Sequence, residues 1–168
     1  MYPASHPVAV TEASAADDML RLERQLCFAL AVASRSVIGA YKPILEPMGL
    51  THPQYLVMLT LWERQQRSLK EIAGVLRLEP ATLSPLVKRL EAAGYVTRER
   101  SEQDERQLAL RLTARGEALR VQAQEVPAKV VQTLGVDIGE LLDLHARLIS
   151  MLERIAPDDG ASSADGSA

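Results

Sequence analysis

The stretch SLKEIAGVLRLEPATLSPLVKRLEAAGYV, residues 68–96, decides the fold. Apolar residues recur in it at helical spacing in two short runs, separated by a break at Arg77 to Pro80, and Gly94 ends the second run. Two short helices around a tight turn predict a helix-turn-helix. The apolar positions are Leu69, Ile72, Ala73 and Leu76 in the first helix and Leu83, Leu86, Val87 and Leu90 in the second.

The second helix of this motif has a short, polar and basic outer face. Hydroxyls and cations on such a face suit the major groove of DNA, where they meet base edges and phosphates. A solvated helix face explains the same composition equally well, because helix-turn-helix geometry also occurs in proteins that never touch DNA. The candidate DNA-binding residues are Thr82, Ser84, Pro85, Lys88 and Arg89.

A β-hairpin follows the two helices. The segments YVTRERS (95–101) and LALRLT (108–113) flank the polar stretch EQDERQ, and the second segment alternates as a half-buried strand does. Asp104 and Arg106 lie at the charged tip, where a carboxylate can orient a guanidinium for entry into a minor groove. The alternative is a surface ion pair worth less than about 1 kcal/mol. The hairpin makes the motif a winged helix-turn-helix.

Helical segments lie on both sides of this unit. Asp17 or Asp18 can cap a long, buried first helix, which Pro43 and Pro47 interrupt, and the segment ends at Gly49. A helix over THPQYLVMLTLWE (51–63) follows, with its cap at the threonine. Beyond residue 113 the pattern is helical again, broken or kinked at residue 127, and DIGELLDLHARLISMLERIA (137–156) carries an apolar stripe that implies a partner helix.

The predicted fold class is therefore mainly α with a small β wing. The folded domain spans residues 17–156, with the winged helix-turn-helix at 53–113 and helical parts at 17–50 and 114–156. The segments 1–16 and 157–168 are rich in small residues, Pro and Ser, and are predicted to be disordered tails.

Composition excludes several classes of protein. The net charge is −3 over 168 residues, yet residues 67–120 hold eleven Lys or Arg against eight Asp or Glu, so positive charge gathers in the middle third. We expect neither a signal peptide nor a membrane span, and hence a cytoplasmic protein. One cysteine and three histidines at unsuitable spacing predict no disulfide, metal or cofactor, and no catalytic motif is present.

Several blocks of the chain, in order, resemble one family of regulators. DERQLALRLT (104–113) matches the wing signature of the MarR winged-helix regulators, and LEPATLSPLVKRLEAAGYVTRERS (78–101) resembles their recognition helix and first wing strand. LCFAL, YKPILEPMGLTHPQYLVMLTLWE and SEQDER are similar to the organic hydroperoxide repressor branch. The resemblance implies a homodimer, with interlocked dimerisation helices at 17–50 and 114–156, that binds an inverted-repeat operator in double-stranded DNA. Its recognition helices would lie about 34 Å apart.

Cys27 has two interpretations. A lone cysteine on an apolar helix is most often an inert filler. In the hydroperoxide branch the cysteine at this place senses peroxide, is hydrogen-bonded by tyrosines when reduced, and releases DNA when oxidised. Arg24 shares its side of the predicted helix, in which Cys27 lies nearly three turns from the start, beyond the reach of the helix dipole. Tyr41 matches one family tyrosine but lies about 21 Å along the helix, so a contact would require the other subunit.

The predicted sensor pocket departs from the branch at two positions. His52 stands where tyrosine is common, and Ala31 occupies another tyrosine position. His52 could serve as a hydrogen-bond donor, or favour the thiolate if protonated, or merely line the helix start. With no second cysteine, the chain resembles the one-cysteine type, so a small cellular thiol or further oxidation would complete the switch.

Three candidate functions follow from these residues. The first is a repressor that senses organic hydroperoxides through Cys27. The second is a repressor released by a small aromatic or phenolic ligand in the dimer cleft, with Cys27 structural. The third, a thiol peroxidase, is disfavoured because no catalytic constellation accompanies the cysteine, so the chain is not expected to be an enzyme.

Overall fold

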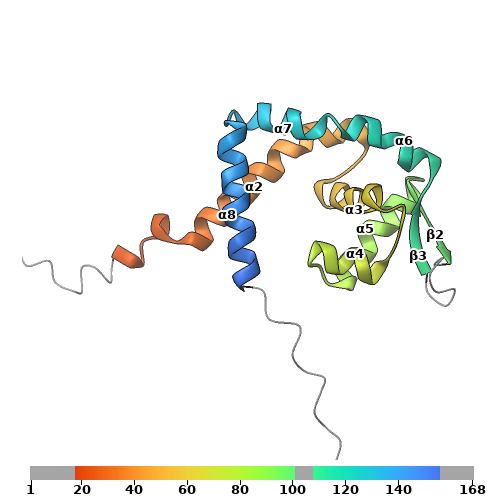
Figure 1. The fold of residues 1–168 in the computed structure, drawn as a ribbon, viewed down its shortest axis with the longest axis horizontal. Helices are drawn as coiled ribbons and strands as arrows, with labels where there is room; N and C mark the ends of the chain where they lie inside the picture. The colour runs from red at the N-terminus through yellow and green to blue at the C-terminus, as the bar shows by residue number, and fades with distance from the viewer. Residues whose placement is uncertain (1–17, 101–107, 156–168) are drawn as a thin grey trace, which may run out of the picture. The chain divides into compact units, whose positions relative to one another are not determined.

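A computed structural model describes residues 18–100 and 108–155 (Figure 1). The predicted class is confirmed: the described chain is mainly helical with one small antiparallel sheet. The predicted tails at 1–16 and 157–168 lie outside the described residues. The elements in order are η1 (Leu22–Arg24), α2 (Leu26–Leu45), η2 (Glu46–Met48), α3 (His52–Glu63), β1 (Gln66–Ser68), α4 (Leu69–Leu76), α5 (Pro80–Ala92), β2 (Val96–Arg100), β3 (Leu108–Leu112), α6 (Ala114–Ala123), α7 (Val126–Leu134) and α8 (Ile138–Ile155).

The first long helix begins later than predicted. Arg21 and Gln25 have extended backbone on either side of the 3-10 turn η1, so α2 starts at Leu26 and not at Asp17 or Asp18. Apolar spacing continues through the turn, and for this reason periodicity alone misplaced the start. The predicted interruption at Pro43 is also wrong, because α2 runs through that residue to Leu45. Proline has no amide hydrogen to donate, and α2 continues for only two residues beyond it.

The turn after α2 follows its sequence signals. Pro47 lies in η2, and Gly49 ends it in the left-handed conformation, with φ of 65°. Thr51 then caps α3, and its amide donates to Oε1 of Gln54 at 2.9 Å, as in a capping box.

Helices α3, α4 and α5 pack around a common core with the sheet. The helix-turn-helix is α4, a three-residue turn and α5, as predicted. Ser68 begins α4 with a capping box, in which its Oγ accepts from the amide of Glu71 and its own amide donates back to that carboxylate. The most deeply buried large side chains are Leu45, Met58, Leu61, Ile72, Leu83, Leu90 and Leu110.

The sheet has the strand order β1-β3-β2. The predicted hairpin is confirmed, with Val96 opposite Leu112 and Arg100 opposite Leu108 in the antiparallel register. The additional strand β1 pairs Arg67 with Leu110. It was not predicted, because a three-residue polar segment carries no hydrophobic alternation from which a strand can be identified.

The described part of the chain divides into two compact units, with the boundary between Val126 and Pro127. In the first unit, α2 was predicted to be buried but exposes most of its apolar side chains, among them Leu26 at 62%. In the second, none of the residues of α8 is buried, and Leu142 is 62% exposed. Both helices therefore present apolar surface that a folded protein normally covers.

The segment Leu26–Met48 also has the length and composition of a membrane-spanning helix, with a mean hydropathy of 1.2. Arg35 and Lys42 lie within it. Length and composition alone do not distinguish such a helix from one that packs against protein.

Candidate nucleic-acid interface and cysteine site

Helix α5 presents the polar face that its sequence predicted. Leu83, Val87 and Leu90 are buried beneath it, and Leu86 is half-buried, so the helix is held by one apolar stripe. The opposite side is open to solvent. Of the candidate DNA-binding residues, Thr82, Pro85, Lys88 and Arg89 are exposed and Ser84 is half-buried.

Local sequence sets where α5 begins. Pro80 is its first residue, a position at which the amide of an ordinary residue would have no helical acceptor. Before it, Arg77 adopts a left-handed conformation with φ of 51° and ends α4. The tight turn between these residues orients α5 relative to α4.

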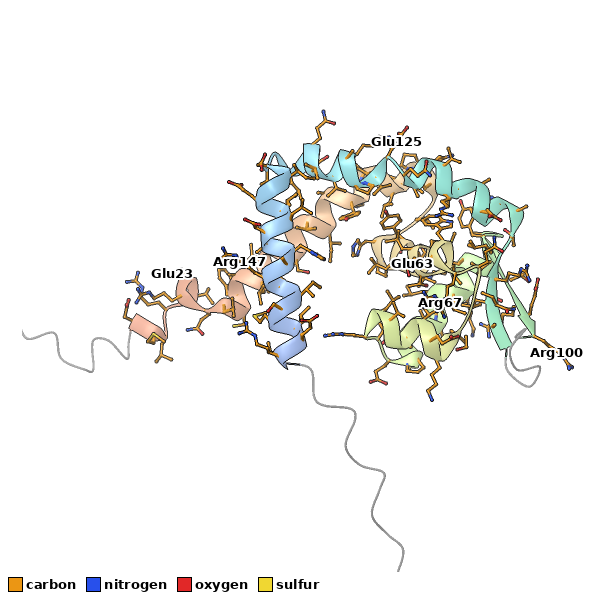
Figure 2. The ribbon with its side chains drawn as sticks, viewed as in Figure 1. Glu23, Glu63, Arg67, Arg100, Glu125 and Arg147 are labelled. Carbon is orange, nitrogen blue, oxygen red and sulfur yellow. The ribbon has the colours of Figure 1, made fainter. Side chains whose placement is uncertain are left out.

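The wing contributes further cations that sequence reasoning missed. Nε of Arg98 in β2 donates to both carboxylate oxygens of Glu91, at 3.0 and 3.1 Å, and so links the first wing strand to the end of α5. Arg100 is exposed at the far end of β2 (Figure 2). In the sequence TRER, Arg98 and Arg100 alternate with Thr97 and Glu99. This alternation could have identified both arginines as side chains on one face of a strand. Asp104 and Arg106 lie outside the described residues.

Cys27 lies in the first turn of α2 and is exposed. The expectation that it lies nearly three turns inside a helix is wrong, because the helix begins at Leu26. Cys27 therefore belongs to the turn whose backbone amides have no acceptor within the helix. Cys27 and Tyr41 do share one continuous helix, so within one chain they are separated by about 21 Å along its axis.

Tyr41 and His52 lie together in the structure. Their ring centroids are 4.9 Å apart in an edge-to-face arrangement, and the ring centroid of Tyr55 lies 6.0 Å from that of Tyr41. Burial lowers the pKa of His52 below 6.5 and raises the pKa of Tyr41 above 10.0. At neutral pH His52 is consequently an uncharged imidazole that can donate or accept a hydrogen bond.

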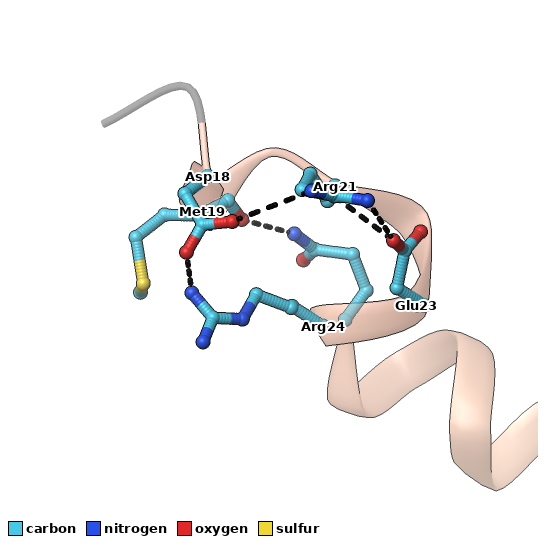
Figure 3. A network of polar contacts seen from close by, with 6 residues as sticks. Asp18, Met19, Arg21, Glu23 and Arg24 are labelled. Atoms are coloured by element: carbon cyan, nitrogen blue, oxygen red, sulfur yellow. Dashed lines mark hydrogen bonds and ion pairs between the residues drawn. The ribbon is translucent and has the colours of Figure 1, made fainter. Parts of the chain in front are cut away.

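Arg24, the third residue predicted around the cysteine, is engaged elsewhere. It lies in η1, before α2 begins, and its guanidinium pairs with the carboxylate of Asp18 (Figure 3). Arg21 donates to Glu23 beside it at 2.9 Å. The structure thus brings Tyr41 and His52 together but pairs Arg24 with an acidic residue of the preceding turn.

An open groove of about 640 Å³ adjoins His52. Ile38, Gly39 and Leu50 give it an apolar lining, and Arg35 and Lys42 bring positive charge to it. Among the residues that the structure describes, neither of these two cations forms an ion pair. Glu46 also lines the groove, so its charged residues are two cations and one anion around a mainly apolar surface.

Comparisons with known proteins agree with this geometry. A family profile described as "Transcriptional regulator SarA/Rot" matches residues 39–121. The chain is 38% identical to the organic hydroperoxide resistance transcriptional regulator of Bacillus subtilis (strain 168), over 82% of this chain and 94% of that protein. It is 40% identical to the HTH-type transcriptional regulator TtmR of Methylorubrum extorquens (strain PA1), over 87% and 75% of the two chains.

A solved structure of reduced AbfR bound to DNA is similar along nearly its whole length. The TM-score is 0.66 at 36% identity, over 85% of this chain and 99% of that one. AbfR, a protein of Staphylococcus epidermidis, has also been solved in a disulfide-formed state and in an overoxidized state bound to DNA.

Proposed function

The chain belongs to the MarR family of winged-helix transcriptional regulators, and from this membership we propose that it is a repressor that senses organic hydroperoxides through Cys27 and then releases its operator. Its relatives are DNA-binding transcriptional regulators and not enzymes, and this chain is likewise a regulator. The single observation that carries the proposal is the place of its one cysteine, exposed in the first turn of α2, in a chain 38% identical to a hydroperoxide resistance regulator.

The proposed redox chemistry takes place at the sulfur atom of Cys27. The thiolate of Cys27 attacks the O–O bond of the hydroperoxide and forms an S–O bond, while the O–O bond breaks and the alkoxide leaves as the alcohol after protonation. Cysteine is oxidised to sulfenic acid and the peroxide is reduced. A small cellular thiol then displaces water from the sulfenic acid to form a mixed disulfide, since the chain holds no second cysteine.

The repressor acts as a homodimer in this proposal. The exposed apolar surfaces of α2 and α8 support it, because a partner chain would remove them from water. Two-fold symmetry would present two α5 helices to successive major grooves, about 34 Å apart, and so select an inverted repeat. The location that follows for a regulator bound to DNA is the cytoplasm.

The sensor pocket would be shared between subunits. Tyr41 lies about 21 Å along α2 from Cys27 of its own chain, and the His52 ring lies beside Tyr41, so we assign both residues to the cysteine of the partner. His52 would take the place of a tyrosine as the neutral hydrogen-bond partner. Arg24 would then act on this pocket only after leaving Asp18.

A second candidate function rests on the groove beside His52. The groove has a mainly apolar lining, and its charged residues Arg35 and Lys42 outnumber Glu46, so it suits a small aromatic or phenolic molecule, which would release DNA with Cys27 serving only as a structural residue. The two candidates differ in whether the thiol is required for release.

Gel-shift titration separates them. The reduced protein, the peroxide-treated protein and the Cys27→Ser variant are titrated against a duplex selected from a random library with the wild-type protein. We expect peroxide to abolish binding by the wild type and to leave the serine variant bound. Oxidation of Cys27 is confirmed by mass spectrometry. If the oxidised wild-type protein still binds the duplex, peroxide sensing is contradicted. If a phenolic anion releases both the wild type and the serine variant from DNA, the second candidate is favoured.

A further inference from the structure

Tyr95 lies where the DNA-reading elements meet. It stands between the end of α5 and the start of β2 and is 6% exposed. Its amide donates to the carbonyl of Leu90 in α5 at 3.0 Å, and its carbonyl accepts from the amide of Thr113, which caps α6, at 3.1 Å. The backbone of one residue thus joins the recognition helix, the wing and the following helix.

The side chain of Tyr95 reaches a different part of the molecule. Its hydroxyl donates to the carbonyl of Met48 at 2.8 Å, in a buried hydrogen bond that spans 47 residues of sequence. Met48 ends η2, directly after the helix that carries Cys27 and Tyr41. This bond therefore ties the cysteine-bearing segment to the junction of the recognition helix and the wing.

Both ends of the hydrogen bond are held in place. The guanidinium of Arg115 lies over the Tyr95 ring, 4.9 Å from its centroid. At the other end, Met48 is buried, and the next residue, Gly49, turns the chain in the left-handed conformation. If either Met48 or Tyr95 moves alone, the buried Tyr95 hydroxyl loses its acceptor, which costs free energy.

We propose that Tyr95 is a positioning residue that transmits a displacement of the α2–η2 segment to the DNA-reading elements. The inference rests on the proposed function, because that function supplies the displacement. A buried hydrogen bond is short and directional, so a movement of the Met48 carbonyl either carries the Tyr95 junction with it or breaks the bond. Either outcome changes how the recognition helix and the wing are held.

The test compares Tyr95→Phe with a matched variant, Thr60→Val. Thr60 also has a buried hydroxyl, which donates to the Val57 carbonyl at 2.8 Å, but that bond stays within α3. Dissociation constants for the selected duplex are measured before and after treatment with cumene hydroperoxide. We expect Tyr95→Phe to reduce the ratio of the two constants by about threefold to tenfold, the range that one buried hydrogen bond is worth, and Thr60→Val to leave it unchanged.

Hydrogen exchange gives a second readout that needs no peroxide. In the wild type, binding of the duplex should slow amide exchange in residues 45–50, which form the end of α2, η2 and the turn that follows, and Tyr95→Phe should lose this protection. Equal release and equal protection in both variants and the wild type would overturn the inference while leaving peroxide sensing intact. A wild type that keeps its DNA after oxidation would overturn peroxide sensing, and exchange alone would then decide the role of Tyr95.

Discussion

At the scale of single residues, Gly116 shows why some positions accept only glycine. A Cβ built on it would lie 2.0 Å from the carbonyl oxygen of Tyr95, which is backbone and cannot rotate away. Its own carbonyl accepts from Nε1 of Trp62 at 3.0 Å, and its amide donates to Oγ1 of Thr113 at 3.1 Å. The start of α6 is therefore pressed against the junction that Tyr95 forms.

We expect Gly116→Ala to destabilise the protein by about 1–3 kcal/mol, because the methyl group forces two backbone segments apart. Gly74→Ala is the matched control. Nothing lies within 4 Å of the methyl group there, and an exposed helical site should gain about 0.5–1 kcal/mol from alanine. Urea unfolding measures the free energy of unfolding of both variants and of the wild type. A Gly116→Ala variant as stable as the wild type would contradict the close approach at Gly116.

His52 provides a prediction in pH. Its pKa is lowered by burial, so the unfolded chain binds a proton more readily than the folded chain does. The contribution of His52 to stability is then fully present above pH 6.5 and is lost as the pH falls from 6.5 through the folded pKa. Proton NMR should give His52 a midpoint below 6.5, with the resonance assigned by its loss in His52→Gln. A midpoint above 6.5 would show that the imidazole is held as a cation instead.

The residue scale also marks a limit of sequence reasoning about the site. Tyr41 and His52 were predicted as pocket residues, and their rings do meet. The position of Cys27 within its helix was mistaken, because its place depends on the extended backbone at Gln25, and the run of apolar residues passes through that break without a signal. The contact of Tyr95 with Met48 spans 47 residues and leaves no local pattern at all.

At the scale of elements, amphipathic patterning predicted the helix-turn-helix well. The buried stripe of α5 is Leu83, Val87 and Leu90, as helical spacing required. Strand β1 escaped prediction, since it is stabilised by pairing with β3 and has no alternation of its own. Propensity likewise failed at Pro43, which α2 accommodates near its end.

The exposed face of α5 leads to a prediction about DNA affinity. Lys88 is exposed on that face, and if it contacts a phosphate, Lys88→Ala should weaken binding across all sequences and reduce the slope of log K against log salt by about 1. Arg120→Ala on α6 removes one exposed cation away from α5 and serves as the control. Fluorescence anisotropy at several salt concentrations measures the slopes. Identical slopes for Lys88→Ala and the wild type would exclude Lys88 from the interface.

At the scale of the whole molecule, the positive charge that suits DNA and the apolar surface that suits a partner chain lie largely on different elements. The chain carries a net charge of −3, whereas residues 67–120 hold an excess of positive charge. The positive charge that attracts DNA is therefore concentrated in and next to the winged helix-turn-helix. Most of the exposed large apolar residues lie on α2 and α8, although Val75 on α4 and Val121 on α6 are exposed too, so association between chains through α2 and α8 need not compete with DNA for the face of α5.

The last prediction concerns that association. Leu142 on α8 is 62% exposed, and burial of this side chain against a partner would make a carboxylate at its place costly. Leu142→Glu should shift the sedimentation equilibrium from dimer toward monomer and weaken DNA binding, because a monomer contacts only one half-site. Ser150→Glu adds the same charge to the polar face of α8 and should leave the dimer intact. The proposal is contradicted if the wild-type chain sediments as a monomer, or if the Leu142→Glu dimer is as stable as the wild-type dimer. Either result would mean that α8 is not covered by a second copy. A two-fold dimer through α8 would then no longer explain binding to an inverted repeat.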